Sequence, residues 1–324
     1  MNSFIIFIFL LFIAITVKAQ EEEPDRTNIR PITSGYYVNP NILDQGILLS
    51  GEKQKQLFIL KDNTSIPELF IDTVADFKEY TVSPDKKSIG FKIIENDKTS
   101  IVVFNIEKKK IIKLLTTTKY CSKVSFSNDE KIGFSVGNYF YVLHKKDTSK
   151  YKFNEKIIDA VISPKGNFAA IVTEKGVIKI LDTKTEETFD ITGTNNISPK
   201  WSPDASKIVF NNGFELVVWN AENSTIYNLG HGSSPQWAPN SEFLIYQKNT
   251  PIKMKFVNAD LYISKFDALE TYQVTSTINL FEMQAIFVSD NEIVYLTYED
   301  RQVIRAKLLN YKQDSFKVLL KVSK

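Results

Sequence analysis

Hydrophobic residues in this chain fall into short runs separated by turn-forming residues, and residues 198–229 show the pattern most clearly. An apolar strand at 207–210 follows the turn Ser202-Pro203-Asp204, and a second strand at 214–219 follows Asn211-Asn212-Gly213. Pro, Asp, Asn and Gly favour such turns. The second strand is apolar on both faces and must therefore be covered on both sides. With strands ending at Trp201 and spanning 225–229, the segment predicts four antiparallel strands.

The same turn recurs along the chain, each time followed by a short apolar strand. The related turns begin at Ser83, Ser127, Ser163, Ser202, Ala238 and Ser289, with steps of 44, 36, 39, 36 and 51 residues. A degenerate seventh copy fits at 41–46. Four strands in each unit of about 40–50 residues are typical of a propeller blade, whereas an immunoglobulin-type unit needs about 100 residues. The sequence predicts an all-β fold, a seven-bladed β-propeller of four-stranded antiparallel blades, over residues 35–324.

Two of these copies carry a family resemblance. Pro199-Lys200-Trp201-Ser202-Pro203-Asp204 and Pro235-Gln236-Trp237-Ala238-Pro239-Asn240 resemble the P-x-W-S-P-D-G repeat of TolB-like propellers. The glycine of that turn survives only as Gly166, and the Gly-rich blade ends of the family are missing. Residues 178–182 also resemble the closing strand of WD40 blades, but the chain contains no Trp-Asp dipeptide. The TolB-like resemblance implies a role in envelope assembly or translocation.

The N-terminus carries an apolar run from Phe4 to Val17, which is shorter than the roughly 20 residues that span a bilayer. Small residues precede a polar Gln-Glu-Glu-Glu stretch, which predicts a signal peptide over residues 1–19 with cleavage after Ala19. A buried core strand and an uncleaved anchor are the alternatives. Residues 20–34 are charged, contain two prolines and are expected to form a loose arm.

Composition limits the classes of function. Removing residues 1–19 from the 324 residues leaves 305, about 44 for each of seven blades, which leaves no room for a second domain. The net charge of +2 falls to about +1 without Lys18, which argues against a dedicated nucleic-acid or membrane surface.

Cys121 is the single cysteine, so no intramolecular disulfide forms; we expect an inert, buried thiol. A monomer in the periplasm or outside the cell is expected.

The first and the last blade of the propeller can be placed in the sequence. Blade one is expected over 35–72, with strands at 46–50, 56–60 and 68–72. Blade seven is expected from Glu282 to about Leu320, with residues 302–308 and 315–320 as its last strands.

The sequence contains none of the common motifs for catalysis or metal binding. The chain has no G-x-S-x-G, H-E-x-x-H, C-x-x-C, Walker A or EF-hand sequence, and its only histidines are His144 and His231. No residues remain for a hydrolase domain, which excludes a propeller-bearing serine peptidase as a whole enzyme. We expect a non-enzymatic protein without cofactor or metal. A channel assembled from distant blades can hide catalytic groups, so a hydrolase, lyase, or sugar- or peptide-binding protein is the alternative.

Residues of the repeated turn have structural and functional interpretations. Trp201 and Trp237 precede the turn at a fixed place, which favours packing between blades over an aromatic ligand cage. Asp85, Asp129 and Asp204 recur within the turn, where local backbone capping explains them more simply than a metal.

The propeller topology predicts one face for a protein partner. The link between consecutive blades and the link between the second and third strands of a blade lie at the same end. Blade six has the longest second link, 248–258, and an exposed loop of this composition suits a contact surface. A solvated hairpin that binds nothing is the alternative. The candidate partner-binding residues, including those expected beside the channel mouth, are Lys200, His231, Gln236, Lys253, Met254, Lys255 and Phe256.

Overall fold

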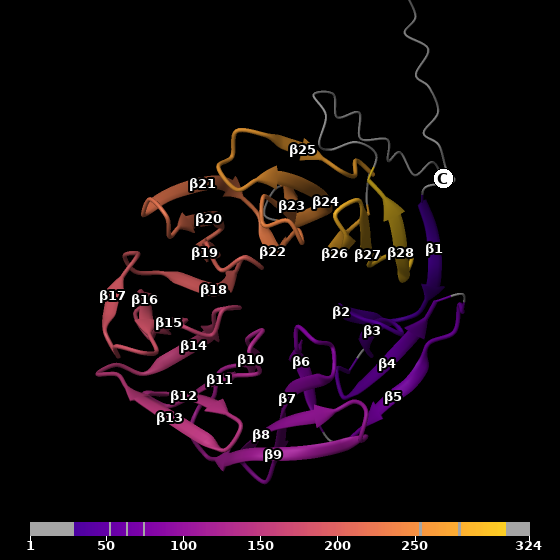
Figure 1. Ribbon diagram of the computed structural model, residues 1–324. Helices are drawn as coiled ribbons and strands as arrows, with labels where there is room; N and C mark the ends of the chain where they lie inside the picture. The colour runs from indigo at the N-terminus through magenta and orange to yellow at the C-terminus, as the bar shows by residue number, and fades with distance from the viewer. Residues whose placement is uncertain are drawn as a thin grey trace, which may run out of the picture.

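The computed structural model describes residues 29–51, 53–62, 64–73, 75–252, 255–277 and 280–308. Within these ranges, 28 strands form seven four-stranded antiparallel sheets, and no helix is present. The sheets are arranged as blades around a central axis (Figure 1). The predicted all-β, seven-bladed propeller is therefore confirmed.

Blades one to three are built from consecutive strands. Blade one contains β2 (Tyr37–Leu43), β3 (Gly46–Gly51), β4 (Gln56–Lys61) and β5 (Glu68–Asp72). Blade two contains β6 (Asp76–Val82), β7 (Ser88–Glu95), β8 (Lys98–Asn105) and β9 (Lys110–Thr117). Blade three contains β10 (Ser125–Phe126), β11 (Ile132–Val136), β12 (Tyr139–His144) and β13 (Asp147–Lys152).

Blades four to six continue in the same way. Blade four contains β14 (Ile157–Ile162), β15 (Phe168–Thr173), β16 (Ile178–Asp182) and β17 (Thr188–Asp190). Blade five contains β18 (Asn196–Trp201), β19 (Lys207–Asn212), β20 (Glu215–Asn220) and β21 (Thr225–His231). Blade six contains β22 (Ser233–Trp237), β23 (Phe243–Ile252), β24 (Lys255–Lys265) and β25 (Thr271–Gln273).

Blade seven is completed by the N-terminal strand. It contains β26 (Glu282–Ser289), β27 (Glu292–Thr297) and β28 (Gln302–Lys307), and β1 (Ile29–Ser34) pairs with β28 as its outermost strand (Figure 1). This corrects the prediction of a loose arm for residues 29–34, while the strand predicted at 315–320 lies outside the described residues. Pro31 is compatible with this position because an outermost strand has a neighbour on one side only.

The order of strands defines two faces of the molecule. In blades one to six the strands follow chain order from the innermost to the outermost. Every innermost strand therefore begins at the same end of the propeller, which we call the loop face. The links between blades and the links between second and third strands lie there. The repeated Ser-Pro-Asp-type turns and the links between third and fourth strands lie at the opposite end, the turn face.

Side chains of neighbouring blades form the core. In β20, Val218 packs with Tyr246 of blade six, whereas Trp219 packs with Ile180 of blade four. This third strand is thus covered on both sides, which is why residues 216–219 are apolar on both faces; Phe214, expected in the same strand, precedes it and is exposed. Cys121 lies in a similar cluster and is 4% exposed, and burial raises the pKa of its thiol to about 11, against a weaker lowering influence from Lys92.

Candidate functional site

A central cavity lies among the innermost strands of the blades. Its volume is about 600 Å³, and residues from the innermost strands of all seven blades line it. A site of this size suits a small molecule or a projecting segment of another protein. The polar residues of the wall are Asn39, Asn41, Glu79, Thr81, Lys123, Ser125, Lys200, Ser234, Gln236 and Gln284.

Irregular pairing near the loop face accompanies this polar lining. In six blades, the register between the innermost and second strands shifts close to where the innermost strand begins. A bulge breaks the alternation of side chains and re-aims those beside it. Four residues at these shifts have positive φ: Asn39 (52°), Ser198 (56°), Ser234 (54°) and Gln284 (52°). Three of the four, all except Ser198, line the cavity.

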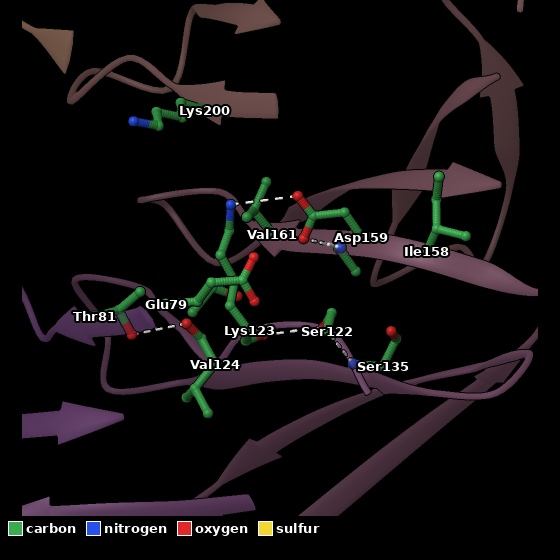
Figure 2. Close-up of polar contacts among 12 residues, drawn as sticks. Glu79, Thr81, Ser122, Lys123, Val124, Ser135, Ile158, Asp159, Val161 and Lys200 are labelled. Carbon is green, nitrogen blue, oxygen red and sulfur yellow. Dashed lines mark hydrogen bonds and ion pairs between the residues drawn. The ribbon is translucent and has the colours of Figure 1, made fainter. Parts of the chain in front are cut away.

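Lys123 of blade three pairs with Asp159 of blade four, and the side chain of Lys200 on blade five lies nearby and points away from this pair (Figure 2). Lys123 Nζ lies 3.3 Å from Asp159 Oδ2, and Asp159 Oδ1 accepts a hydrogen bond of 2.9 Å from the backbone N–H of Ala160. Lys200 lies on the neighbouring blade and donates from Nζ to the backbone oxygen of Pro235 at 2.9 Å. The Asp159 carboxylate is therefore held by Lys123 and by the backbone.

The surroundings of Lys200 weaken its basicity. Lys200 is half-buried and lines the cavity. Burial lowers the pKa of Lys200 to about 7, and the nearby Lys123 ammonium acts in the same direction, opposed by Asp159. Lys200 thus presents an amine that changes charge near neutral pH.

A series of hydrogen bonds links neighbouring blades around the cavity. The indole N–H of Trp201 donates to the backbone oxygen of Val161 at 3.2 Å, and that of Trp237 donates to the oxygen of Lys200 at 3.0 Å. Both tryptophans are partly buried and use their only polar atom within the protein. This geometry favours packing between blades, and not an aromatic ligand cage, as the role of the two tryptophans. Three further bonds belong to this series: Tyr80 OH to Asn39 O (2.5 Å), Thr81 Oγ1 to Val124 O (2.8 Å) and Asn39 N to Gln284 Oε1 (2.7 Å).

The recurring aspartates cap their own turns. Ser202 Oγ donates to Asp204 Oδ1 at 2.5 Å, and the same oxygen accepts a bond from the backbone N–H of Ser206 at 3.0 Å. Burial works to raise the pKa of Asp204, but these hydrogen bonds outweigh it and lower the pKa to about 2. Asp85 and Asp129 accept the equivalent serine hydroxyl, and their pKa values are also lowered. Local bonding accounts for all three carboxylates.

The other residues proposed from the sequence occupy different positions. Gln236 lines the cavity together with Lys200. His231 is exposed at the end of the outermost strand β21 and is not among the residues that line the cavity, which differs from the expected position beside the channel. Lys253 and Met254 lie outside the described residues. For Lys255 and Phe256 the structure describes the backbone only, as part of β24.

Sequence reasoning missed Lys123 and Asp159, although a positional signal was present. Both lie four residues before the first serine of a repeated turn, as does Glu79. This position therefore holds a charged residue in three consecutive blades, and two of the three, Glu79 and Lys123, line the cavity. Their pairing depends on how the blades are placed beside one another, which the spacing alone does not give.

The described ranges lack two features that would point to a particular kind of site or location. No group of three or more His, Cys, Asp or Glu side chains that could hold a metal ion is present among those residues. In the same part of the chain, no helix is long and apolar enough to cross a membrane.

Comparisons with known proteins agree on the fold. No protein-family model matches the sequence, and a search of curated proteins gives no match. Among solved structures, TolB from Acinetobacter baumannii is similar at 15% identity with a TM-score of 0.53, over 79% of this chain and 60% of the TolB chain. This chain therefore matches less than two thirds of the length of that TolB.

Two other solved structures have the same architecture. Oligogalacturonate lyase in complex with manganese matches at 9% identity with a TM-score of 0.63, over 87% of this chain and 93% of the lyase. A chain of the mitotic checkpoint complex matches at 11% identity with a TM-score of 0.58, over 95% and 99% of the two chains. At these identities the likeness concerns the fold alone. It shows that this chain has the β-propeller fold that TolB and these two proteins also have.

Proposed function

We propose that this chain is an exported, non-catalytic interaction module that binds a protein partner on its loop face. Export rests on the apolar run and the small residues that precede Gln20, and it places the propeller in the periplasm or outside the cell. A role in envelope assembly or translocation follows from the TolB-like resemblance.

The distribution of exposed aromatic residues carries this proposal. Four exposed aromatic side chains lie in links of the loop face, between blades or between second and third strands. They are Tyr36, Tyr120, Phe214 and Tyr298, with exposed fractions of 41%, 47%, 81% and 66%. On the turn face, the exposed large hydrophobic residues in links of the described chain are the aliphatic Ile66 and Leu269. Tyrosine and phenylalanine are enriched at protein interfaces, so the loop face is the better docking surface.

The wall of the cavity supports binding over catalysis. Glu79, a carboxylate of this wall, pairs with Lys92 at 3.0 Å. Lys123, which also lines the cavity, pairs at 3.3 Å with Asp159, which does not. Glycoside cleavage uses a pair of carboxyl groups that flank the bond, and the residues that line this cavity include one carboxyl group, that of Glu79. Lys200 instead offers a hydrogen-bond donor to a group that a docked partner inserts from the loop face.

Two matched substitutions test the proposal. Phe214 and Leu269 are both 81% exposed and lie on opposite faces. Replacing Phe214 by Ser weakens capture of partner proteins from an envelope extract, whereas Leu269→Ser leaves capture unchanged. Both variants keep the unfolding midpoint, because exposed side chains contribute little to stability. Equal capture by the two variants contradicts a loop-face partner that uses blade five.

The hairpin of blade six is a second part of the proposed surface. Replacing Met254 and Phe256 together by Ser is expected to weaken capture without lowering the unfolding midpoint. A loss of stability in this double variant means that these side chains belong to the core.

A small-molecule or sugar-binding protein remains the second candidate, because a polar cavity of about 600 Å³ lies within the range of ligand sites. Lys200→Met and Phe214→Ser together distinguish the two. A ligand held inside the cavity loses affinity in Lys200→Met and keeps it in Phe214→Ser, because Phe214 does not line the cavity. A protein partner on the loop face is captured less well by Phe214→Ser.

A further inference from the structure

Blades six and seven meet at a second polar site, away from the cavity. A single parallel bridge joins Ala259 of β24 to Phe281, immediately before β26. The bridge is reinforced by a hydrogen bond of 3.2 Å from the N–H of Ala259 to the oxygen of Leu280. The next residue on each strand is acidic: Asp260 on blade six and Glu282 on blade seven. The register of the bridge therefore places two carboxylates side by side.

Both carboxylates are buried and only partly bonded. Glu282 is 0% exposed and Asp260 is 7% exposed. Glu282 Oε1 accepts a bond of 3.1 Å from the hydroxyl of Thr277, but Oε2 has no partner among the described residues. Asp260 Oδ1 and Asn258 Oδ1 also lack a partner within that part of the chain. An unpaired buried acceptor is costly, and an unpaired buried charge costs more.

The contacts of Thr277 bring these oxygens together. Its backbone hydrogen-bonds to Asp260, while its hydroxyl donates to Glu282, so one residue touches both carboxylates. Tyr295 adds a further oxygen: it is 0% exposed, its hydroxyl has no partner in the described structure, and the charge of Glu282 acts on it. The result is a cluster of oxygen atoms with unused bonding capacity.

The charge of this cluster is unbalanced. Burial raises the pKa of Glu282 to about 7, and the neighbouring Asp260 acts in the same direction. The lysine paired with Asp260 across the hairpin is Lys248, whose ammonium instead lies over the Tyr262 ring, 4.4 Å from its centroid. The described residues provide no ion pair for Asp260 or Glu282. A positive charge is missing at this position.

We propose that Asp260, Glu282 and Asn258 bind a calcium ion that joins blade six to blade seven. The donors are all oxygen atoms, which suit Ca²⁺, whereas Zn²⁺ prefers nitrogen and sulfur. Two carboxylates neutralise the ion, and the amide oxygen, neighbouring hydroxyls and water complete six to eight ligands. None of the three residues lines the central cavity, so the site is separate from that cavity.

Calcium titration of the chelator-treated protein at pH 8 tests the site. The unfolding midpoint is expected to rise by roughly 5 °C when the Ca²⁺ concentration is about a hundred times the dissociation constant. Glu282→Gln keeps the shape but removes the charge, and it abolishes this rise. The matched control is Glu215→Gln in β20 of blade five, and this variant is expected to keep the calcium-dependent rise of the unfolding midpoint. Without calcium, Glu282→Gln is expected to unfold at a higher temperature than the wild type, since a buried charge is gone.

Luminescence of Tb³⁺, which replaces Ca²⁺ and is excited through nearby tyrosine, gives an independent readout. Wild-type protein is expected to sensitise Tb³⁺, and the signal is expected to fall in Tyr295→Phe and vanish in Asp260→Asn. If neither Ca²⁺ nor Tb³⁺ binds the wild type, the carboxylates share a proton and the proposal is overturned. The same holds if binding survives both Glu282→Gln and Asp260→Asn, because the ion then lies elsewhere.

Discussion

Trp201 offers the clearest test of how the blades are held together. Its ring packs against a cluster of blades four and five, and its indole N–H reaches Val161 on blade four. Replacing a fully buried tryptophan by alanine costs about 3–5 kcal/mol. Trp201 is partly exposed to the cavity, so we expect Trp201→Ala to lower the free energy of unfolding by about 3 kcal/mol.

The hydrogen bond can be separated from the packing. Trp201→Phe keeps an aromatic ring but removes the N–H, and a typical protein hydrogen bond contributes about 1 kcal/mol. Trp219 is only 5% exposed, so Trp219→Ala is expected to fall at the upper end of the range for buried tryptophan. Phe214→Ala, at an 81% exposed position, is the control and is expected to change stability by less than about 0.5 kcal/mol.

Urea unfolding of the four variants measures these differences. The order of destabilisation from structure is Trp219→Ala, Trp201→Ala, Trp201→Phe and then Phe214→Ala. If Trp201→Ala leaves the midpoint unchanged and instead abolishes ligand binding, Trp201 belongs to a ligand cage and the inter-blade explanation is wrong.

Three further predictions concern the ends of the chain and the turns. A chain that begins at Gly35 lacks β1, so it is expected to unfold at lower temperature and to aggregate through the freed edge of β28; an unchanged midpoint contradicts closure by β1. The Asp204 carboxylate stabilises the fold above its unfolded pKa of 3.8, and this contribution is lost as pH falls through about 2. Because Asp204 is 47% exposed, Asp204→Asn is expected to cost no more than about 1 kcal/mol at pH 6 and nothing near pH 2, as measured by urea unfolding. Sequencing of protein from its native host is expected to begin at Gln20; a cytoplasmic chain beginning at Met1 rules out export.

The regular part of the fold was predictable because it is local. Each repeated turn, such as the one at Ser202, lies next to the strands that it joins, so spacing alone predicts blades. Closure of the ring is not local: Ile29 pairs with Ala306, nearly the whole propeller away in sequence. Pro31 and the charged surroundings suggested an arm, and no pattern within residues 29–34 indicates their partner strand.

For the candidate site, too, positions within one blade were predictable from the sequence, and contacts between blades were not. Lys200 and Gln236 were expected at the channel as part of innermost strands, and both line the cavity. They lie near the ends of β18 and β22, beside the repeated turns, and not at the strand starts from which the expectation was drawn. The pairing of Lys123 with Asp159 joins two blades, and so does the approach of Asp260 to Glu282. Such contacts depend on the relative placement of blades, which hydrophobic periodicity does not record.

Site-specific photo-crosslinking in the native host tests the central claim, a protein partner on the loop face, most directly. A benzophenone-bearing phenylalanine replaces Phe214 on the loop face and, separately, Leu269 on the turn face, both 81% exposed. A discrete crosslinked adduct at position 214 that is absent at position 269 is the expected result. An adduct only at position 269, or the same adducts at both positions, contradicts a partner that docks on the loop face.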